Sequence, residues 1–236
     1  MTLISKRKFI TGAAVATVGS VAGVVTNSHA QVGQMDRESG LRTGKMKPIQ
    51  YTELAGFLSA EQIAPHYNNH YGGALRGHLA IDAQIEQMSK SRTIDANAHA
   101  TMQRGRTQRG NSALLHEVFF DGMTSADSSP RANIRRSIEM RFGSIDNWQR
   151  EFAAAAASAT GWAVLAYNRI SEKLYNVVSD AHADGVYWQS VPIIALDMYE
   201  HSYYIDYQNN KAPYIEKYFD YLNWQAADNR FVEARK

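Results

Sequence analysis

The chain has 236 residues, of which 44% are hydrophobic, and it contains no cysteine. This composition is ordinary for a globular protein and allows a sizeable core. Because cysteine is absent, the sequence excludes disulfides, thiolate metal sites and cysteine nucleophiles. Any metal would therefore be held by nitrogen and oxygen ligands. The formal net charge is +2.

Residues 1–30 have the pattern of an export signal peptide. Three basic residues at positions 6–8 precede an apolar, uncharged stretch over residues 10–25, and small residues at 28 and 30 offer a cleavage site. The start resembles a twin-arginine signal with lysine in the first arginine position, which leaves the general secretory route open. An uncleaved amphipathic anchor is the alternative. We expect an exported protein, periplasmic or in the cell envelope, without a stable membrane span after signal removal.

The charge of the remaining chain argues against a nucleic-acid partner. Three of the 25 basic residues lie within residues 1–30 and none of the 23 acidic ones does, so the net charge falls from +2 to −1. Binding to a phosphate backbone requires a basic face. We therefore expect no nucleic-acid binding.

Residues 31–50 are polar, with glycine and mixed charge, and predict a flexible lead-in. The next pattern is helical over residues 58–89. Ser59 and Gln62 fit a capping box at its start, and Pro65 in the second turn should bend or fray the helix.

The polar residues 90–108 predict a loop, and residues 112–122 predict a second helix. Two helices joined in this way form an antiparallel hairpin. We therefore expect a helical-hairpin domain over residues 51–129, which ends in a linker rich in serine.

The last part of the chain, residues 130–236, predicts helices followed by strands and a final helix. The expected helices cover 131–141, 146–159 with Asp146 as cap, and 213–227; the expected strands cover 162–168, 174–179 and 191–197. Because strands and helices do not alternate strictly, the pattern favours an α+β fold. We expect the helical hairpin to be followed by an α/β domain with a small three-stranded antiparallel sheet.

Asp197 ends the last predicted strand, and His201 follows four residues later. A carboxylate at a strand end points into whatever cavity lies beyond, and an imidazole four residues on can reach the same point. The spacing is common by chance, so a capping aspartate and a surface histidine remain the alternative.

Residues 200–209 closely resemble the C-terminal signature of iron/manganese superoxide dismutases. Three further stretches agree with that family in order and spacing, namely 59–67, 116–120 and 142–162. The resemblance covers residues 57–227 and implies that His66, His116, Asp197 and His201 bind one iron or manganese ion per subunit. Three imidazoles and one carboxylate suit such first-row ions. The implied reaction is the disproportionation of superoxide, the substrate, to oxygen and hydrogen peroxide.

The resemblance also implies residues around the metal. The family places a solvent-binding glutamine at one of two positions, which are Ser112 and His182 here. We expect His182 to bind the metal-bound solvent; a loop histidine in water is the alternative, because a one-residue shift would put Ala183 there. Trp162 should form a wall of the cavity, and Tyr199 stands where the family usually has tryptophan.

Ala74 stands where the family has a gateway tyrosine. Loss of that hydroxyl should weaken proton delivery and widen the entrance, unless His78, one helical turn on, partly refills the space. Ala74 and His182 therefore leave an alternative open, a metal-binding relative with reduced or different redox activity. A metal-binding envelope protein without enzymatic activity is a further alternative.

The resemblance finally implies a homodimer, with a tetramer left open. His70 would pair with Tyr204 of a neighbouring subunit, and Glu200 would bond His201 across the contact. An ordinary helix-surface histidine is the alternative for His70.

Overall fold

The computed structural model describes residues 37–185 and 187–236. The predicted signal peptide, residues 1–30, and the first part of the predicted lead-in lie outside the described residues. Among the helices that the structure describes, none is long and apolar enough to cross a bilayer.

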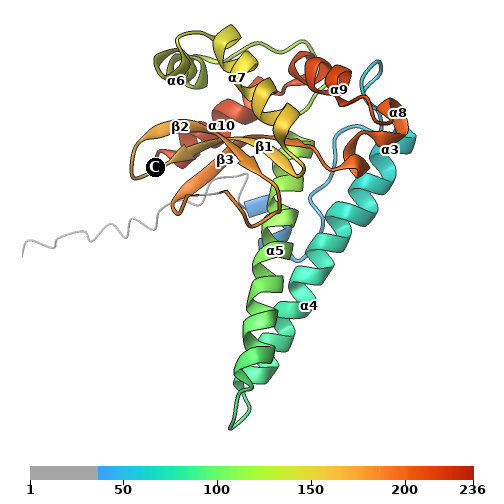
Figure 1. Cartoon of the computed structure of the whole chain (residues 1–236), viewed down its shortest axis with the longest axis vertical. Helices are drawn as coiled ribbons and strands as arrows, with labels where there is room; N and C mark the ends of the chain where they lie inside the picture. The colour runs from blue at the N-terminus through green and yellow to red at the C-terminus, as the bar shows by residue number, and fades with distance from the viewer. Residues whose placement is uncertain (1–36, 186) are drawn as a thin grey trace, which may run out of the picture. The chain divides into compact units, whose positions relative to one another are not determined.

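The fold is α+β, as predicted: helices precede and follow one small antiparallel sheet (Figure 1). In chain order the described elements are α2 (Gly40–Thr43), α3 (Ala60–Pro65), the π-helix η1 (His66–Tyr71), α4 (Gly72–Ser89), α5 (Ala96–Asp121), α6 (Ala132–Phe142), α7 (Ile145–Ser158), β1 (Trp162–Asn168), β2 (Lys173–Ser179), β3 (Ser190–Asp197), the 3-10 helix η2 (Glu200–Ser202), α8 (Tyr204–Tyr207), α9 (Lys211–Tyr218), the 3-10 helix η3 (Phe219–Tyr221) and α10 (Trp224–Ala234).

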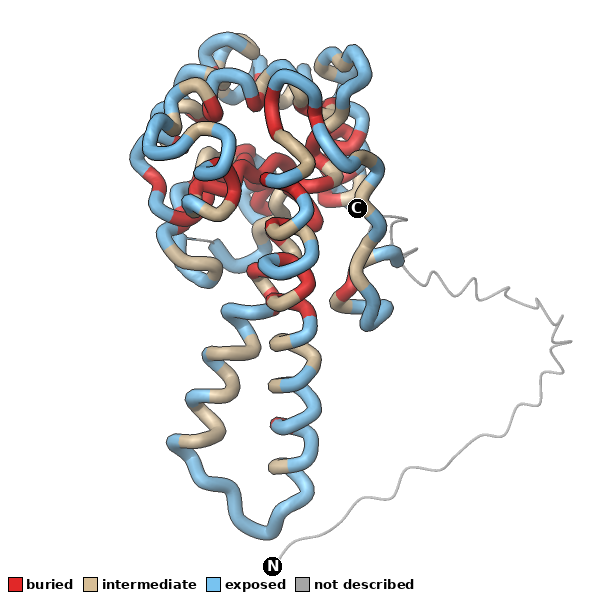
Figure 2. The backbone as a smooth tube through the Cα atoms, turned by 90° about the vertical axis from the view of Figure 1, so that its right-hand side faces the viewer, coloured by how far each residue is buried: buried red, intermediate tan, exposed pale blue. Residues whose placement is uncertain are grey.

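Helices α4 and α5 form the predicted hairpin, but the expected loop over residues 90–108 is wrong from Ala96 onward. Asp95 caps α5 by accepting a hydrogen bond from the Ala98 amide. The first half of α5 has no burial pattern from which a helix could be predicted. Figure 2 shows that the far end of the hairpin is exposed and that burial begins near the sheet. The buried residues of α5 start only at Gly110, so its first half lacks an apolar stripe.

The chain stays helical through Pro65, but the ordinary α-helical winding of α3 ends at this residue. Helix α3 runs into the π-helix η1, in which the Gly72 amide donates to the carbonyl of Tyr67, five residues back. Ser59 caps α3 through the Gln62 amide. The predicted capping box is only half formed, because the Ser59 amide donates to Asp206 instead.

The sheet has the strand order β2-β1-β3, and its three strands match the predicted ones to within one residue. At one end Trp162 lies opposite both Asp197 and Ser179; at the other, Asn168 lies opposite Ser190 and Lys173. Every residue of the central strand β1 is buried. Helices α6 and α7 lie on one side of the sheet, and the sheet end of α5 lies on the other (Figure 1).

Two helix boundaries differ from the prediction. The cap of α7 is Ser144, whose side chain accepts from the Asn147 amide, while Asp146 lies in the first turn. The single final helix expected over 213–227 is three elements, α9, η3 and α10. The chain restarts at Asn223, which caps α10 through the Ala226 amide.

The lead-in differs from the expected flexible segment over its described part. The Gly40 amide donates to the Glu117 carboxylate (2.8 Å), and the Lys47 amide donates to the Tyr71 hydroxyl (2.8 Å). A Cβ on Gly40 would lie 2.8 Å from the backbone carbonyl of Lys45 and 2.7 Å from the Leu75 side chain, so only glycine fits this approach. These contacts fix the segment against the hairpin.

Candidate metal centre

Four side chains from separate parts of the chain converge at one end of the sheet. His66 begins η1, His116 lies in the sheet end of α5, Asp197 ends β3, and His201 lies in η2. One nitrogen or oxygen atom from each lies within 4.8 Å of all the others. The first three side chains are almost fully buried, and that of His201 is 22% exposed. This is the set that the resemblance predicts.

The hydrogen bonds of His116 define its protonation. Its Nδ1 lies 2.7 Å from the carbonyl of Ser112, and a carbonyl only accepts, so Nδ1 carries the proton. The other ring nitrogen, Nε2, therefore has a lone pair that points into the cluster. Nε2 is the single buried side-chain polar atom of the described residues without a hydrogen-bond partner. An unpartnered buried lone pair is costly unless something binds it, which is what a metal ion would do.

The Asp197 carboxylate is the common neighbour of the three imidazoles. Its Oδ2 lies 3.2 Å from Nε2 of both His66 and His201, and 3.5 Å from Nε2 of His116. Burial raises the pKa of Asp197, but hydrogen bonds from His201 and His66 outweigh it, so the pKa lies below its usual value. The Tyr199 amide donates to the other oxygen, Oδ1. The carboxylate is thus ionised and fixed in orientation.

The buried imidazoles are neutral at pH 7. Burial lowers the pKa of His116 to about 3 and also lowers that of His66. The buried carboxylate of Asp197 carries a negative charge that its neutral neighbours His66 and His116 do not offset, which is unfavourable in a low-dielectric site. A metal cation would supply that counter-charge, so the donor set and its electrostatics both fit one ion.

Two aromatic rings hold His201 from either side. His70 stacks on it with ring centres 3.7 Å apart and an interplanar angle of 13°, and Tyr199 stacks at 5.3 Å and 10°. Behind the ring, the Gln62 side chain donates to the carbonyl of His201 (2.6 Å). Sequence reasoning missed Gln62, although it lies four residues before His66 on the same helical face.

His182 lies beside the cluster, in the loop between β2 and β3. The Trp162 indole donates to Nδ1 of His182 (2.9 Å), and the ring of His182 is 6.3 Å from that of His116 and 5.0 Å from that of Tyr199. Because indole is only a donor, Nδ1 must accept and the proton of neutral His182 is on Nε2. Burial lowers the pKa of His182, which favours this neutral form. Trp162 also packs edge-to-face on His116.

The position at which the resemblance places a gateway tyrosine is buried in this structure. Ala74 is 2% exposed and belongs to the core. His78 packs against α5 near Gly110, and its Nδ1 lies 3.2 Å from the Arg106 carbonyl. None of the ring contacts of the described residues joins His78 to the four clustered side chains.

The residues that the resemblance assigns to a dimer contact lie at the surface. His70, Glu200 and Tyr204 are all exposed, and Tyr204 is followed by Ile205, whose exposure of 57% is large for an isoleucine. This exposure is compatible with a covered interface, and the pairing itself remains a prediction.

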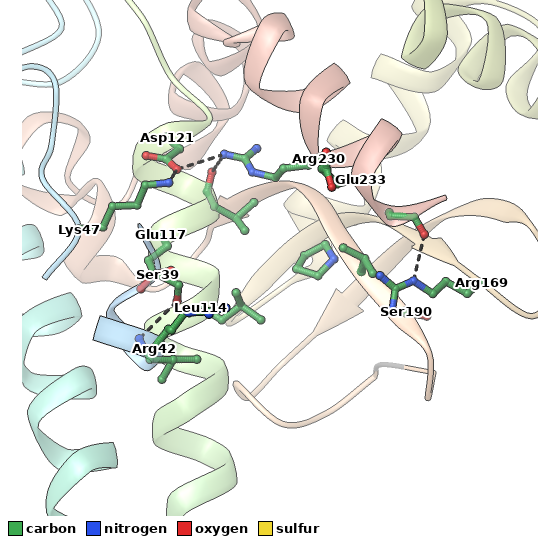
Figure 3. A pocket seen from close by; sticks show the side chains of 15 residues that line it. Ser39, Arg42, Lys47, Leu114, Glu117, Asp121, Arg169, Ser190, Arg230 and Glu233 are labelled. Carbon is green, nitrogen blue, oxygen red and sulfur yellow. Dashed lines mark hydrogen bonds and ion pairs between the residues drawn. The ribbon is translucent and has the colours of Figure 1, made fainter. Parts of the chain in front are cut away.

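A second missed group, Glu117, lies directly behind His116 on α5. It accepts from the Tyr71 hydroxyl (2.9 Å) and the Gly40 amide, and the ring of Tyr71 stacks on His116. Glu117 also lines a separate cavity of about 530 Å³ (Figure 3). In it the cations Lys47 and Arg230 lie against Asp121, so the buried charges of this cavity are compensated within the chain.

The fold and the cluster define a class of protein, a helical hairpin joined to a three-stranded sheet with nitrogen and oxygen donors between them that could hold one metal ion. The family model of iron/manganese superoxide dismutases, C-terminal domain, matches residues 130–230.

Relatives that match more than three quarters of the chain agree with the family model. The chain is 34% identical over 188 residues to superoxide dismutase [Mn] 1 of Halobacterium salinarum, covering 79% of this chain and 93% of the relative. It is 35% identical over 195 residues to a superoxide dismutase [Fe] of Cupriavidus metallidurans, covering 80% and 97%. A superoxide dismutase [Fe] of Aquifex pyrophilus is 32% identical over 186 residues, covering 76% and 86%. The chain belongs to the iron/manganese superoxide dismutase family, a family of oxidoreductases.

Proposed function

We propose that this protein is a superoxide dismutase that binds one iron or manganese ion through His66, His116, Asp197 and His201. The observation that carries the proposal is the buried, unpartnered Nε2 of His116 facing three further donor atoms. When bound, the ion would supply the electron exchange by which two superoxide ions and two protons become one oxygen and one hydrogen peroxide.

The chain's own residues prepare this site. The carbonyl of Ser112 holds the His116 ring with its lone pair inward, which is the usual way in which outer groups orient a ligating histidine. His70 and Tyr199 hold the plane of His201. The charge of Asp197 offsets one positive charge of the ion.

His182 is proposed as the group that binds solvent at the metal. The indole of Trp162 occupies Nδ1 of His182 as an acceptor, so the proton on Nε2 is available for donation. A donor beside the metal-bound solvent would stabilise the form of that solvent that accepts the hydrogen bond. It would thereby shift both the pKa of the solvent and the reduction potential of the site. The resemblance gives this place to a glutamine amide, which is likewise a donor.

The proposal is tested on the purified native protein by elemental analysis and by steady-state superoxide turnover. We expect one iron or manganese ion per chain and turnover far above that of the free metal. A protein that takes up neither ion under metal-replete expression would contradict the proposal. Electron paramagnetic resonance of the same sample decides between iron and manganese.

A second candidate, a metal-loaded relative with reduced or different redox activity, is favoured by Ala74. A buried alanine at the gateway position offers no hydroxyl for proton delivery. Full metal occupancy with near-background superoxide turnover across pH would support this candidate against the first.

Homodimer formation through the surface around Glu200 and Tyr204 is part of the proposal. Sedimentation velocity should give twice the chain mass, and Glu200→Ala should shift the protein toward the monomer. A monomeric wild type would contradict it.

Export is proposed from residues 1–30. Cell fractionation should recover the protein outside the cytoplasm with Gln31 as its first residue by mass spectrometry. A cytoplasmic protein that retains Met1 would contradict the proposal.

A further inference from the structure

The end of the sheet farthest from the metal centre carries exposed apolar side chains. Trp188 is 94% exposed, Ile170 79%, Met140 78% and Tyr187 59%. A strand of seven residues separates this end from Trp162, which places it roughly 20 Å from the metal centre. Single exposed apolar residues are normal, but four at one end of a fold indicate an interaction site.

Hydrogen bonds of Asn168 connect Ile170 and Trp188. The Asn168 side chain donates to the carbonyl of Trp188 (2.9 Å) and accepts from the amide of Ile170 (3.2 Å). The adjacent Arg169 amide donates to the Gln189 carbonyl. Both loops are therefore held side by side by an almost fully buried asparagine, so their exposed side chains are fixed at one end of the sheet.

Next to these loops is a basic groove of about 810 Å³, formed by α6, the turn between β1 and β2, and the end of α10. Figure 1 shows the C-terminus beside this end of the sheet, with α6 on the same side. The residues that carry the argument are Arg136, Met140, Arg141, Glu172, Lys173 and Arg235.

The four cations of the groove make no ion pair with any residue that the structure describes. Two of them are held in place: Arg141 donates to the Leu174 carbonyl and lies 5.5 Å from the centre of the Tyr175 ring, and Arg235 lies over Phe231. Glu172 is the one acid of the groove. Residues 31–236 have a net charge of −1, so this groove concentrates positive charge that the chain as a whole does not have.

We propose that this surface, Trp188, Tyr187, Ile170 and Met140 together with the basic groove, docks the protein onto an anionic phospholipid membrane. Exposed tryptophan and tyrosine favour the headgroup region of a bilayer, and cations near an anionic bilayer are each worth about 1 kcal/mol. A nucleic acid would use the cations and tryptophan but would leave Ile170 and Met140 in water, which favours the lipid. The inference goes beyond the proposed activity, because the surface lies far from the metal centre.

Trp188 provides a local readout of docking. The chain has four tryptophans, and Trp148, Trp162 and Trp224 are at most 3% exposed, so aqueous acrylamide should quench chiefly Trp188. The full chain is mixed with vesicles of phosphatidylcholine alone or with phosphatidylglycerol. We expect anionic vesicles to protect Trp188 from acrylamide and shift its emission to the blue, and neutral vesicles to do neither. Trp188→Phe should remove both signals.

Two double variants test whether binding depends on the groove or only on the total positive charge. Both variants keep residues 1–30, so any contribution of that segment is the same in each. Arg136→Gln with Lys173→Gln should weaken partitioning to anionic vesicles roughly 30-fold. Arg92→Gln with Arg104→Gln, which removes two exposed cations at the far end of the hairpin, should leave it unchanged. Added salt should weaken the wild type most.

Four results would overturn the proposal. The first is that acrylamide still quenches Trp188 fully when anionic vesicles are present. The second is that the two double variants partition equally to anionic vesicles. Protection by single-stranded DNA but not by vesicles would assign the surface to a nucleic acid. Protection that grows with protein concentration in the absence of vesicles would assign it to a second copy of the chain. Far-ultraviolet circular dichroism and urea unfolding serve as the folding controls for all variants.

Discussion

The two ends of the three-stranded sheet treat charge in opposite ways. At the end formed by Trp162 and Asp197, ionisable groups are buried and hold one another in fixed geometry. At the other end, beyond Asn168, cations and aromatic side chains are exposed, and the cations have no partner among the described acids. Because the first end is buried, the loss of a single polar atom there should change metal binding or the free energy of unfolding. Because the second end is exposed, substitutions there should hardly change the free energy of unfolding, and its side chains are available for contact. The following predictions test that contrast.

The largest effect is expected at Asp197. Asp197→Ala removes the only carboxylate of the cluster. Substituting a residue that only hydrogen-bonds to a ligand typically lowers metal affinity by up to about 100-fold, so this change should lower it by more. Metal content and superoxide turnover measure this. The exposed Asp127→Ala is the matched control, and a fully loaded Asp197→Ala protein would refute the ligand assignment.

The next largest effect compares a buried with an exposed arginine. Arg230 is 7% exposed and donates to the carbonyls of Ile193 and Val118 beside Asp121. Arg230→Ala should lower the free energy of unfolding by about 3–5 kcal/mol, because it breaks a buried charged network. Arg136→Ala should change it by less than about 0.5 kcal/mol. Urea unfolding measures the change in free energy for each variant. Similar changes for Arg230→Ala and Arg136→Ala would contradict the prediction.

Acid should destabilise the metal-free protein through His116. Its folded pKa of about 3 lies below the ordinary 6.5 because of burial, so between these values the unfolded chain binds the extra proton. The free energy of unfolding should therefore fall as the pH falls through this window, by about 1.4 kcal/mol per pH unit for this one group. Unfolding series of wild type and His116→Leu test it, and equal slopes would contradict the prediction.

A smaller effect is expected for His182→Ala. It leaves the indole N–H of Trp162 without its acceptor, at a cost of about 1–3 kcal/mol, and it should shift the reduction potential of the loaded protein. Redox titration measures the shift, with His99→Ala as a control outside the cluster. An unchanged potential would remove His182 from the solvent-binding role.

The smallest effect is expected at Trp188. Because its side chain is 94% exposed, Trp188→Ala should change the free energy of unfolding by less than about 0.5 kcal/mol and leave superoxide turnover unchanged. A loss of several kcal/mol would mean that the loop supports the core, against its exposure.

The sequence predicted best what depends on burial patterns. The strands were found almost to the residue because β1 and β3 are runs of buried apolar residues. The first half of α5 was missed because it packs on α4 alone, and a helix covered on one narrow side carries no apolar stripe. The break at Asn223 was missed because its capping role depends on one side-chain hydrogen bond.

For the candidate metal centre, the clustering of four side chains was predicted by resemblance, since the spacing of Asp197 and His201 alone is common by chance. Local pattern could not reveal that Gln62 reaches the carbonyl of His201, because the two residues are 139 positions apart. The same holds for the hydrogen bond from Trp162 to His182, which depends on how a loop folds back. Side-chain contacts between distant segments are a property of the fold and leave no trace in periodicity.

The π-helix η1 changes the rotational position of the α4 side chains about the helix axis. A bond that spans five residues accommodates one residue more than the ordinary helical bond, and one residue corresponds to roughly 100° of rotation about the helix axis. Every side chain of α4 is therefore turned relative to an uninterrupted continuation of α3. Deleting a single residue from 67–70 would return the helix to its ordinary winding and leave Ala74 and Leu75 on their buried face, whereas deleting one residue from an ordinary turn of α4 would rotate the side chains beyond it by roughly 100°. The π-helix η1 is thus the segment of this helix that can lose one residue without turning the buried face of α4 away from the core.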